Sequence, residues 1–151
     1  MPPGRIKKGE NQMLKAKDIM STNVVSVKKD TPIYEAIAIL LSNEITGMPV
    51  VDDDMNLLGI ITEKDCLRLF YADEDEKNET VQYFMTQPAV HYNENDSLQT
   101  ICNFMMINYF RRVPVTSKKG KVVGILSRPD VIRQILAQRR KEQSMSVLKV
   151  K

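Results

Sequence analysis

The chain has 151 residues, of which 42% are hydrophobic and 27% are charged, as in an ordinary globular domain. It has no apolar run near the roughly 20 residues of a membrane span and no signal-like leader, so we expect no membrane contact and a cytoplasmic location. The net charge is +3, but residues 20–137 carry 12 Lys and Arg against 16 Asp and Glu, so the positive surplus lies in the two ends. Nucleic-acid binding would therefore depend on those ends.

The chain repeats itself at an offset of 65 residues. The segment Gly59–Asp65, GIITEKD, returns as Gly124–Asp130, GILSRPD. The same offset aligns Met20 with Met85, and apolar positions also match where the residues differ. A repeat of this length predicts one supersecondary unit used twice, with the two copies burying each other.

Each copy is predicted to run strand, helix, strand, strand, helix. In the first copy Thr31 is expected as the N-cap and Pro32 as the first helical residue. The apolar face of that helix is expected at Ile33, Ala36, Ile37, Leu40 and Leu41. The elements are expected as a short turn or helix at 15–20, a strand at 24–27, a helix from 32, strands at 48–51 and 57–62, and a closing helix from 63 to about 70.

The second copy repeats this pattern after an acidic stretch at 71–80 that is predicted to be an exposed linker. Asp96 with Gln99 resembles a capping box. The apolar face of the helix that follows is expected at Leu98, Ile101, Cys102, Met105 and Met106. Strands are expected at 113–116 and 122–127, and a helix from 128 to about 138. The predicted organisation is a flexible segment at 1–14, a first repeat at 15–72, an acidic linker at 73–80, a second repeat at 81–138 and a basic tail at 139–151.

The motif that ends each copy has two interpretations. The strand ends and a helix begins at Thr62 in one copy and at Ser127 in the other, and free N–H groups at a helix start favour an anion such as phosphate. The hydroxyl would add a phosphate donor, while Asp65 or Asp130 would accept hydrogen bonds from the two hydroxyls of a ribose. Thr-x-x-Asp is equally a capping box, and a duplicated fold duplicates its caps. The sequence leaves both interpretations open.

Other candidate residues carry weaker signals. Arg111 and Arg112 stand where the first copy has Thr46 and Gly47, so this pair is not required by the fold and is a candidate for binding phosphates. His91 has no second histidine or neighbouring cysteine, and the acidic turn 52–54 is matched by a basic one, so we expect no metal site. Cys66 and Cys102 replace Val and Ile and are expected to be buried thiols. We find no catalytic constellation and expect no enzyme.

These residues together resemble a tandem pair of CBS domains, named for cystathionine β-synthase. The resemblance covers residues 15–138 and is carried by Asp18-Ile19-Met20, residues 24–27, Thr31-Pro32, Thr46–Asp52, Gly59–Asp65, Met85, Val90, Val113-Pro114-Val115 and Gly124–Asp130. It implies an α+β fold of two β-α-β-β-α repeats that pack sheet to sheet about a pseudo-twofold axis. Two such pairs commonly form a disc-shaped homodimer.

The resemblance also implies a function, which is regulatory binding of AMP, ADP, ATP or S-adenosylmethionine between the repeats, with a signal passed to an unidentified protein partner. The implied leading site comprises Asn23, Val24, Val25, Ile45, Thr46, Gly47, Arg111, Arg112, Ser127 and Asp130. The implied second site comprises Thr62, Asp65, Gln87, Pro88, Val90 and Phe110. Pro88 lacks the backbone donor that Asn23 offers, so the first site is favoured. A ligand-free dimerisation module and nucleic-acid binding through the basic tails remain the alternatives.

Overall fold

The computed structural model describes residues 14–150, so the predicted flexible segment lies, apart from Leu14, outside the described residues. The first repeat contains α2 (Ala16–Ile19), β1 (Val27–Lys28), α3 (Ile33–Ser42), β2 (Gly47–Val51), β3 (Leu57–Thr62), α4 (Glu63–Cys66) and the 3-10 helix η1 (Leu67–Tyr71). The second contains α6 (Val81–Phe84), β4 (Tyr92–Asn93), α7 (Leu98–Ile107), β5 (Arg112–Thr116), β6 (Val122–Ser127) and α8 (Arg128–Val150), after α5 (Glu74–Lys77).

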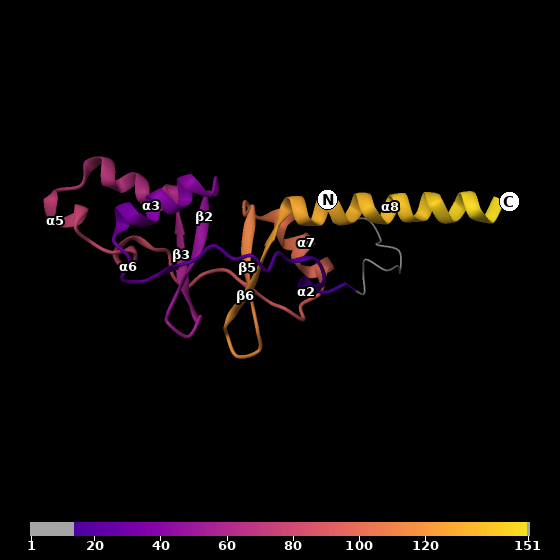
Figure 1. Cartoon of the computed structure of the whole chain (residues 1–151), viewed down its shortest axis with the longest axis horizontal. Coiled ribbons are helices and arrows are strands. Elements are labelled where there is room, and N and C mark those ends of the chain that lie inside the picture. Colours follow the sequence, from indigo (N-terminus) through magenta and orange to yellow (C-terminus); the bar gives the residue numbers. More distant parts are fainter. Residues whose placement is uncertain (1–13, 151) are drawn as a thin grey trace.

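The described chain forms two three-stranded sheets of the same design. In each sheet the short first strand runs parallel to the second, and the second runs antiparallel to the third. The registers match at the 65-residue offset, since Val50 lies opposite Gly59 and Val115 lies opposite Gly124. Figure 1 shows the two sheets side by side at the centre of the molecule, with α3 and α7 on the outer sides. The predicted α+β fold of two β-α-β-β-α repeats is confirmed.

The apolar face of α3 packs on the first sheet, as its spacing predicts, but it is narrower than expected. Ile33, Ala36 and Leu40 are buried, whereas Leu41 is 67% exposed. α7 behaves in the same way, with Met105 buried and Met106 exposed. An α-helix resting on one sheet buries about one stripe at i, i+3 and i+7, so the fifth apolar position of each helix is left outside.

Each hydrophobic core includes residues of a short helix that belongs, in the sequence, to the other repeat. Val81 and Phe84 of α6, which precede the second sheet in the chain, lie in the core of the first repeat. Ala16 of α2, which precedes the first sheet, lies in the core of the second repeat, with Met20 packed against it. The structural units are therefore interleaved, and neither sequence repeat contains a complete core.

The residues that follow α6 and α2 form backbone hydrogen bonds with the edge strands β3 and β6, respectively. The N–H groups of Ile60 and Thr86 donate to each other's carbonyl oxygens at 2.9 and 2.8 Å. Ser21 and Ile125 make the equivalent pair, with both bonds at 2.9 Å. These bridges place the segment leading into each repeat against the last strand of the other one.

We predict that Gly59→Ala destabilises the protein, because this bridge brings backbone into contact with the glycine. A Cβ at position 59 would lie 2.7 Å from the carbonyl oxygen of Thr86 and 2.9 Å from Sδ of Met85. The strand would have to shift, at a cost of about 1–3 kcal/mol in the free energy of unfolding. Urea denaturation followed by circular dichroism measures this cost. An unchanged unfolding midpoint would contradict the close approach.

The predicted helix caps are wrong in two places. Pro32, not Thr31, is the N-cap of α3, so the helix begins at Ile33. Ser97, not Asp96, caps α7, and its Oγ accepts a hydrogen bond from the N–H of Thr100 at 3.1 Å. Asp96 instead accepts from the N–H of Asn93 at 2.8 Å and closes the preceding turn.

Several element boundaries also differ from the prediction. The first strand is confined to Val27–Lys28, and the helix expected from 63 to about 70 divides into α4 and η1. The acidic linker contains α5, whose N-cap Asp73 accepts from the N–H of Glu76 at 2.9 Å. The predicted tail is not a separate segment, because α8 continues through it to Val150 (Figure 1).

Candidate functional site

The start of α8 is closed by a reciprocal cap between Ser127 and Asp130. Oδ2 of Asp130 accepts hydrogen bonds from the N–H and the Oγ–H of Ser127, both at 2.8 Å. The N–H of Asp130 donates in turn to Oγ of Ser127 at 3.3 Å. Oδ1 of the same carboxylate is paired with the guanidinium of Arg133. This is the capping box that the motif also predicted.

The cap corrects the expectation that free N–H groups at this helix start would bind phosphate. The N–H of Arg128 donates to the carbonyl oxygen of Arg111 at 3.0 Å, Pro129 has no N–H, and that of Asp130 is used within the cap. A phosphate at this position would therefore have to be bound by side chains.

The equivalent carboxylate in the first repeat has different partners. Oδ2 of Asp65 accepts from the N–H and the Oγ1–H of Thr62, both at 2.9 Å, as in the other copy. Its Oδ1 accepts from Oγ1–H of Thr86 at 3.0 Å, so both carboxylate oxygens are bound by the chain itself. Arg68, which aligns with Arg133, lies over the ring of Phe84 with its Cζ 4.9 Å from the ring centroid.

A cleft of about 820 Å³ lies between the two repeats. It is lined by Ser21, Asn23, Val25, Ile45, Thr46, Gly47, Met48, Pro49, Ile60, Thr62, Glu63, Lys64, Tyr109, Phe110, Arg111, Arg112, Val113, Pro114, Ile125, Ser127, Asp130 and Arg133. This volume is within the usual range for small-molecule sites. Apolar residues of the strands could pack against a flat ring, and the charged side chains could bind a polar group.

The lining is symmetric in part. At some positions both residues related by the 65-residue offset contribute, for example Thr62 with Ser127 and Pro49 with Pro114. At others only one of the two does, as with Asn23, Val25, Asp130 and Arg133. Their counterparts Pro88, Val90, Asp65 and Arg68 are not among the lining residues.

The structure thus brings together most of the residues predicted for the leading site. Nine of them line the cleft, namely Asn23, Val25, Ile45, Thr46, Gly47, Arg111, Arg112, Ser127 and Asp130. Val24 does not line it, and its N–H donates to the carbonyl oxygen of Thr22 at 3.1 Å. Of the predicted second site, Thr62 and Phe110 line this same cleft, while Asp65, Gln87, Pro88 and Val90 lie outside it. A second site at Asp65, Gln87, Pro88 and Val90 stays a prediction from the sequence.

Five polar lining residues were missed from the sequence: Ser21, Glu63, Lys64, Tyr109 and Arg133. Arg133 carried a signal, because it is one of the identities between the repeats at the 65-residue offset. Glu63 and Lys64 stand inside the motif Gly59–Asp65 but differ from their counterparts, so the comparison of repeats passed over them. Tyr109 replaces Glu44 and had no signal of its own.

The charge of the cleft is predominantly positive. Lys64, Arg111, Arg112 and Arg133 line it, against the carboxylates of Glu63 and Asp130. A cleft with apolar walls strengthens the electric field of the charges that line it. The excess of positive charge therefore favours an anionic ligand over a cationic one.

The remaining candidates lie outside the cleft. His91 is exposed, with Nδ1 3.0 Å from the carbonyl oxygen of Ala89. Among the described residues no group of three or more His, Cys, Asp or Glu is placed to hold a metal ion. Cys66 and Cys102 are free, partly buried thiols that pack against different cores. Burial, with Asp65 and Glu63 nearby, raises the pKa of the Cys66 thiol, so it is held in the unreactive protonated form.

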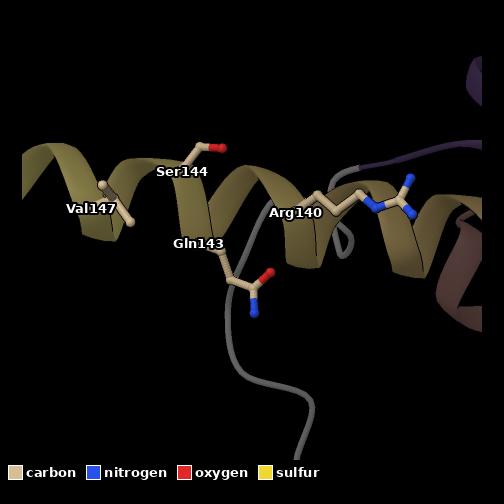
Figure 2. Close-up of a pocket in the computed structure, with 4 residues that line it drawn as sticks. All are labelled: Arg140, Gln143, Ser144 and Val147. Carbon is tan, nitrogen blue, oxygen red and sulfur yellow. The ribbon is translucent and has the colours of Figure 1, made fainter.

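A shallow hollow on α8 is not a competing site. It is lined by Arg140, Gln143, Ser144 and Val147, which all belong to that helix. Figure 2 shows Ser144 and Gln143 pointing in opposite directions from the ribbon. Side chains spread around one exposed helix do not converge on a ligand. Within residues 14–150, moreover, no helix combines the length and the apolarity that crossing a membrane requires.

The sequence profile of the CBS domain matches this chain twice, at residues 16–72 and 81–137. Protein MJ1225 of Methanocaldococcus jannaschii is 33% identical over 117 residues, which cover 78% of this chain and 41% of that protein. The chloroplastic protein CBSX2 of Arabidopsis thaliana is 26% identical over 149 residues, covering 81% and 63%. An inosine-5'-monophosphate dehydrogenase of M. jannaschii is 28% identical over 120 residues, covering 80% of this chain and 23% of the enzyme. The chain therefore spans less than two thirds of the length of these relatives.

Solved structures of two CBS pairs superpose on the described fold. CBSX2 in complex with AMP has a TM-score of 0.74 and 29% identity, covering 83% of this chain and 98% of that one. The CBS domain pair of protein MJ0100, in complex with 5'-methylthioadenosine and S-adenosyl-L-methionine, has a TM-score of 0.69 and 27% identity, with the same coverage. The likeness extends over both repeats.

Proposed function

The chain belongs to the CBS-domain family, and from this membership we propose that it is a regulatory module that binds an adenosine-containing ligand in the cleft between its repeats. Two similar CBS pairs have been crystallised with ligands of this kind, AMP in one case and S-adenosyl-L-methionine with methylthioadenosine in the other. We further propose that the chain has no catalytic activity of its own.

One observation favours this function over a ligand-free scaffold. The cleft opens where the two repeats differ, so that Asn23 and Val25 from the first repeat face a cleft shared with Ser127 and Asp130 from the second. Asn23 is exposed, and its amide offers a donor and an acceptor for reading an adenine ring. In this proposal Asp130 accepts from ribose hydroxyls, and Arg111 with Arg112 pairs with phosphate; all three residues line the cleft.

The proposed mechanism is a shift between relative orientations of the repeats. A ligand in this cleft contacts both repeats, so it favours the orientation in which both sets of contacts are made. The surfaces that the repeats present to a partner protein then change with ligand occupancy. The partner would be identified as a protein whose binding to this chain changes when the ligand is added.

We also propose that the protein forms a homodimer. Large apolar side chains are exposed on the outer sides of both repeats, including Leu67, Phe70 and Tyr71 of η1 and Ile132 and Ile135 of α8. Exposed apolar side chains of this size are typical of protein interfaces. The second copy would cover them.

Binding is expected to raise the melting temperature. At 100 times its dissociation constant a ligand stabilises the fold by about 2.7 kcal/mol, which for a chain of this size raises Tm by roughly 5–10 °C. Differential scanning fluorimetry with AMP, ADP, ATP, S-adenosylmethionine and guanosine monophosphate measures the shift and its base selectivity. Native mass spectrometry of untreated protein reports any co-purified nucleotide and the dimer in one spectrum. No shift with any adenosine compound at millimolar concentration would leave the ligand-free scaffold as the better account.

A further inference from the structure

The carboxylate of Asp130 is engaged by an arginine on its open side. Its side chain is only 12% exposed, whereas that of Arg133 is 70% exposed, and the two form an ion pair through Oδ1 of Asp130. The other oxygen, Oδ2, is bound by Ser127. Oδ1 is thus the atom that Arg133 shields from the cleft, which both residues line.

The equivalent arginine of the first repeat has a different role. Arg68 lies over the rings of Tyr83 and Phe84, with its Cζ 5.6 and 4.9 Å from their centroids, and it donates to the carbonyl oxygen of Tyr83 at 3.3 Å. It does not line the cleft. The residues that correspond to these two rings at the 65-residue offset are Asp18 and Ile19 of α2, neither of which is aromatic, so Arg133 has no such pair of rings. Of the two arginines at this repeat position, Arg68 therefore packs on aromatic rings and Arg133 lines the cleft.

A ribose that binds Asp130 would compete with Arg133. The hydroxyls of a ribose need acceptor oxygens, and Oδ1 is available to them only if the guanidinium moves. An ion pair with one strongly exposed partner contributes little to stability, so this movement is inexpensive. The displaced guanidinium is then free to pair with an anion bound in the cleft, which the backbone N–H groups at the start of α8 cannot bind because they are already bonded.

We propose that Arg133 is a phosphate-binding residue of the cleft, whose guanidinium moves from Asp130 to the ligand's phosphate when ribose hydroxyls take its place. This inference rests on the proposed function and narrows its ligand class to adenosine phosphates. A neutral nucleoside would leave the displaced guanidinium without an anion. The sulfonium of S-adenosylmethionine would add a positive charge to a cleft already lined by Lys64, Arg111, Arg112 and Arg133.

The test compares AMP with adenosine, because the two differ only in the phosphate. Isothermal titration calorimetry would be run on the full chain and on Arg133→Gln, Arg133→Lys and Arg68→Gln. The full chain is expected to bind AMP more tightly than adenosine. Loss of a charge-assisted bond in Arg133→Gln should weaken AMP binding by about tenfold or more and leave adenosine binding unchanged or tighter. Arg133→Lys, which keeps the charge, should recover part of the preference.

The matched control is Arg68→Gln, which removes the same side chain at the same repeat position outside the cleft. It should retain the AMP-to-adenosine ratio of the full chain. Equal binding of AMP and adenosine by the full chain, or an unchanged ratio in Arg133→Gln, would overturn the role of Arg133 while leaving adenosine binding in place. If neither compound nor any other adenosine phosphate binds the full chain, the proposed function fails together with this inference.

Discussion

Replacing Phe84 with alanine should lower the free energy of unfolding by about 3–5 kcal/mol, as for other fully buried aromatic residues. Phe84 is 3% exposed and lies in the core of the first repeat, although its helix α6 stands before the second repeat in the sequence. Its truncation would leave a cavity beneath α3 and would remove the ring beside Arg68. Urea denaturation monitored by circular dichroism measures the loss.

The adjacent residue supplies the control. Tyr83 is 50% exposed and contacts Arg68 and the edge of the Phe84 ring, but it is not part of either core. Tyr83→Ala should therefore cost less than about 1 kcal/mol, the usual limit for a surface position with one cation–π contact. Hydrogen exchange on Phe84→Ala should show protection lost in α3 of the first repeat before α7 of the second. Loss confined to α7 would contradict the interleaved cores.

The fold was largely predictable because the same pattern of residues occurs twice in the sequence. An apolar spacing, a turn and a glycine that recur at a fixed offset gave the order of elements, and β6 begins and ends at the predicted residues. Which core each helix joins was not predictable. A buried apolar face specifies that a helix must pack, but residues such as Val81 and Ala16 satisfy this requirement equally well in either repeat.

The errors in the caps have a local physical cause. Ser97 and Asp96 are adjacent, and either could accept from the first N–H groups of α7. In the structure Asp96 accepts from the N–H of Asn93 in the preceding turn, and Ser97 caps the helix. The length of α8 was missed for a different reason, since residues after 138 show no continuous apolar stripe and residues 139–147 are exposed. Apolar periodicity does not mark a helix segment whose described side chains are exposed.

Part of the site was predicted from the motif that the repeats share, and part from positions where the repeats differ. Arg111 and Arg112 were found by contrast with Thr46 and Gly47. Arg133 is identical in type to Arg68, and only their surroundings separate the two roles. The partner of Asp65 likewise depends on Thr86, which is brought to it by the bridge to Ile60. Such contacts follow from tertiary structure and cannot be read from the motif.

Replacing Asp130 with alanine should weaken AMP binding by about 1.5–3 kcal/mol, because a charged acceptor for ribose hydroxyls is lost. The same change removes the cap of α8, which should lower the stability of the empty protein by about 0.5–2 kcal/mol. A single variant therefore confounds binding with stability. The internal repeat separates them, since Asp65 caps α4 through the same pair of bonds to Thr62.

Asp65→Ala is thus expected to cost about as much stability, within the same range of roughly 0.5–2 kcal/mol, and to leave the affinity for AMP close to that of the full chain. Chemical denaturation without ligand gives the first quantity and calorimetric titration the second. A ribose-binding role predicts similar stabilities for Asp65→Ala and Asp130→Ala but unequal affinities. If both variants lose stability and both retain full affinity, the two carboxylates are caps and nothing more. If Asp65→Ala loses affinity to the same extent, the ligand lies across the pseudo-twofold axis instead of at the Asp130 end.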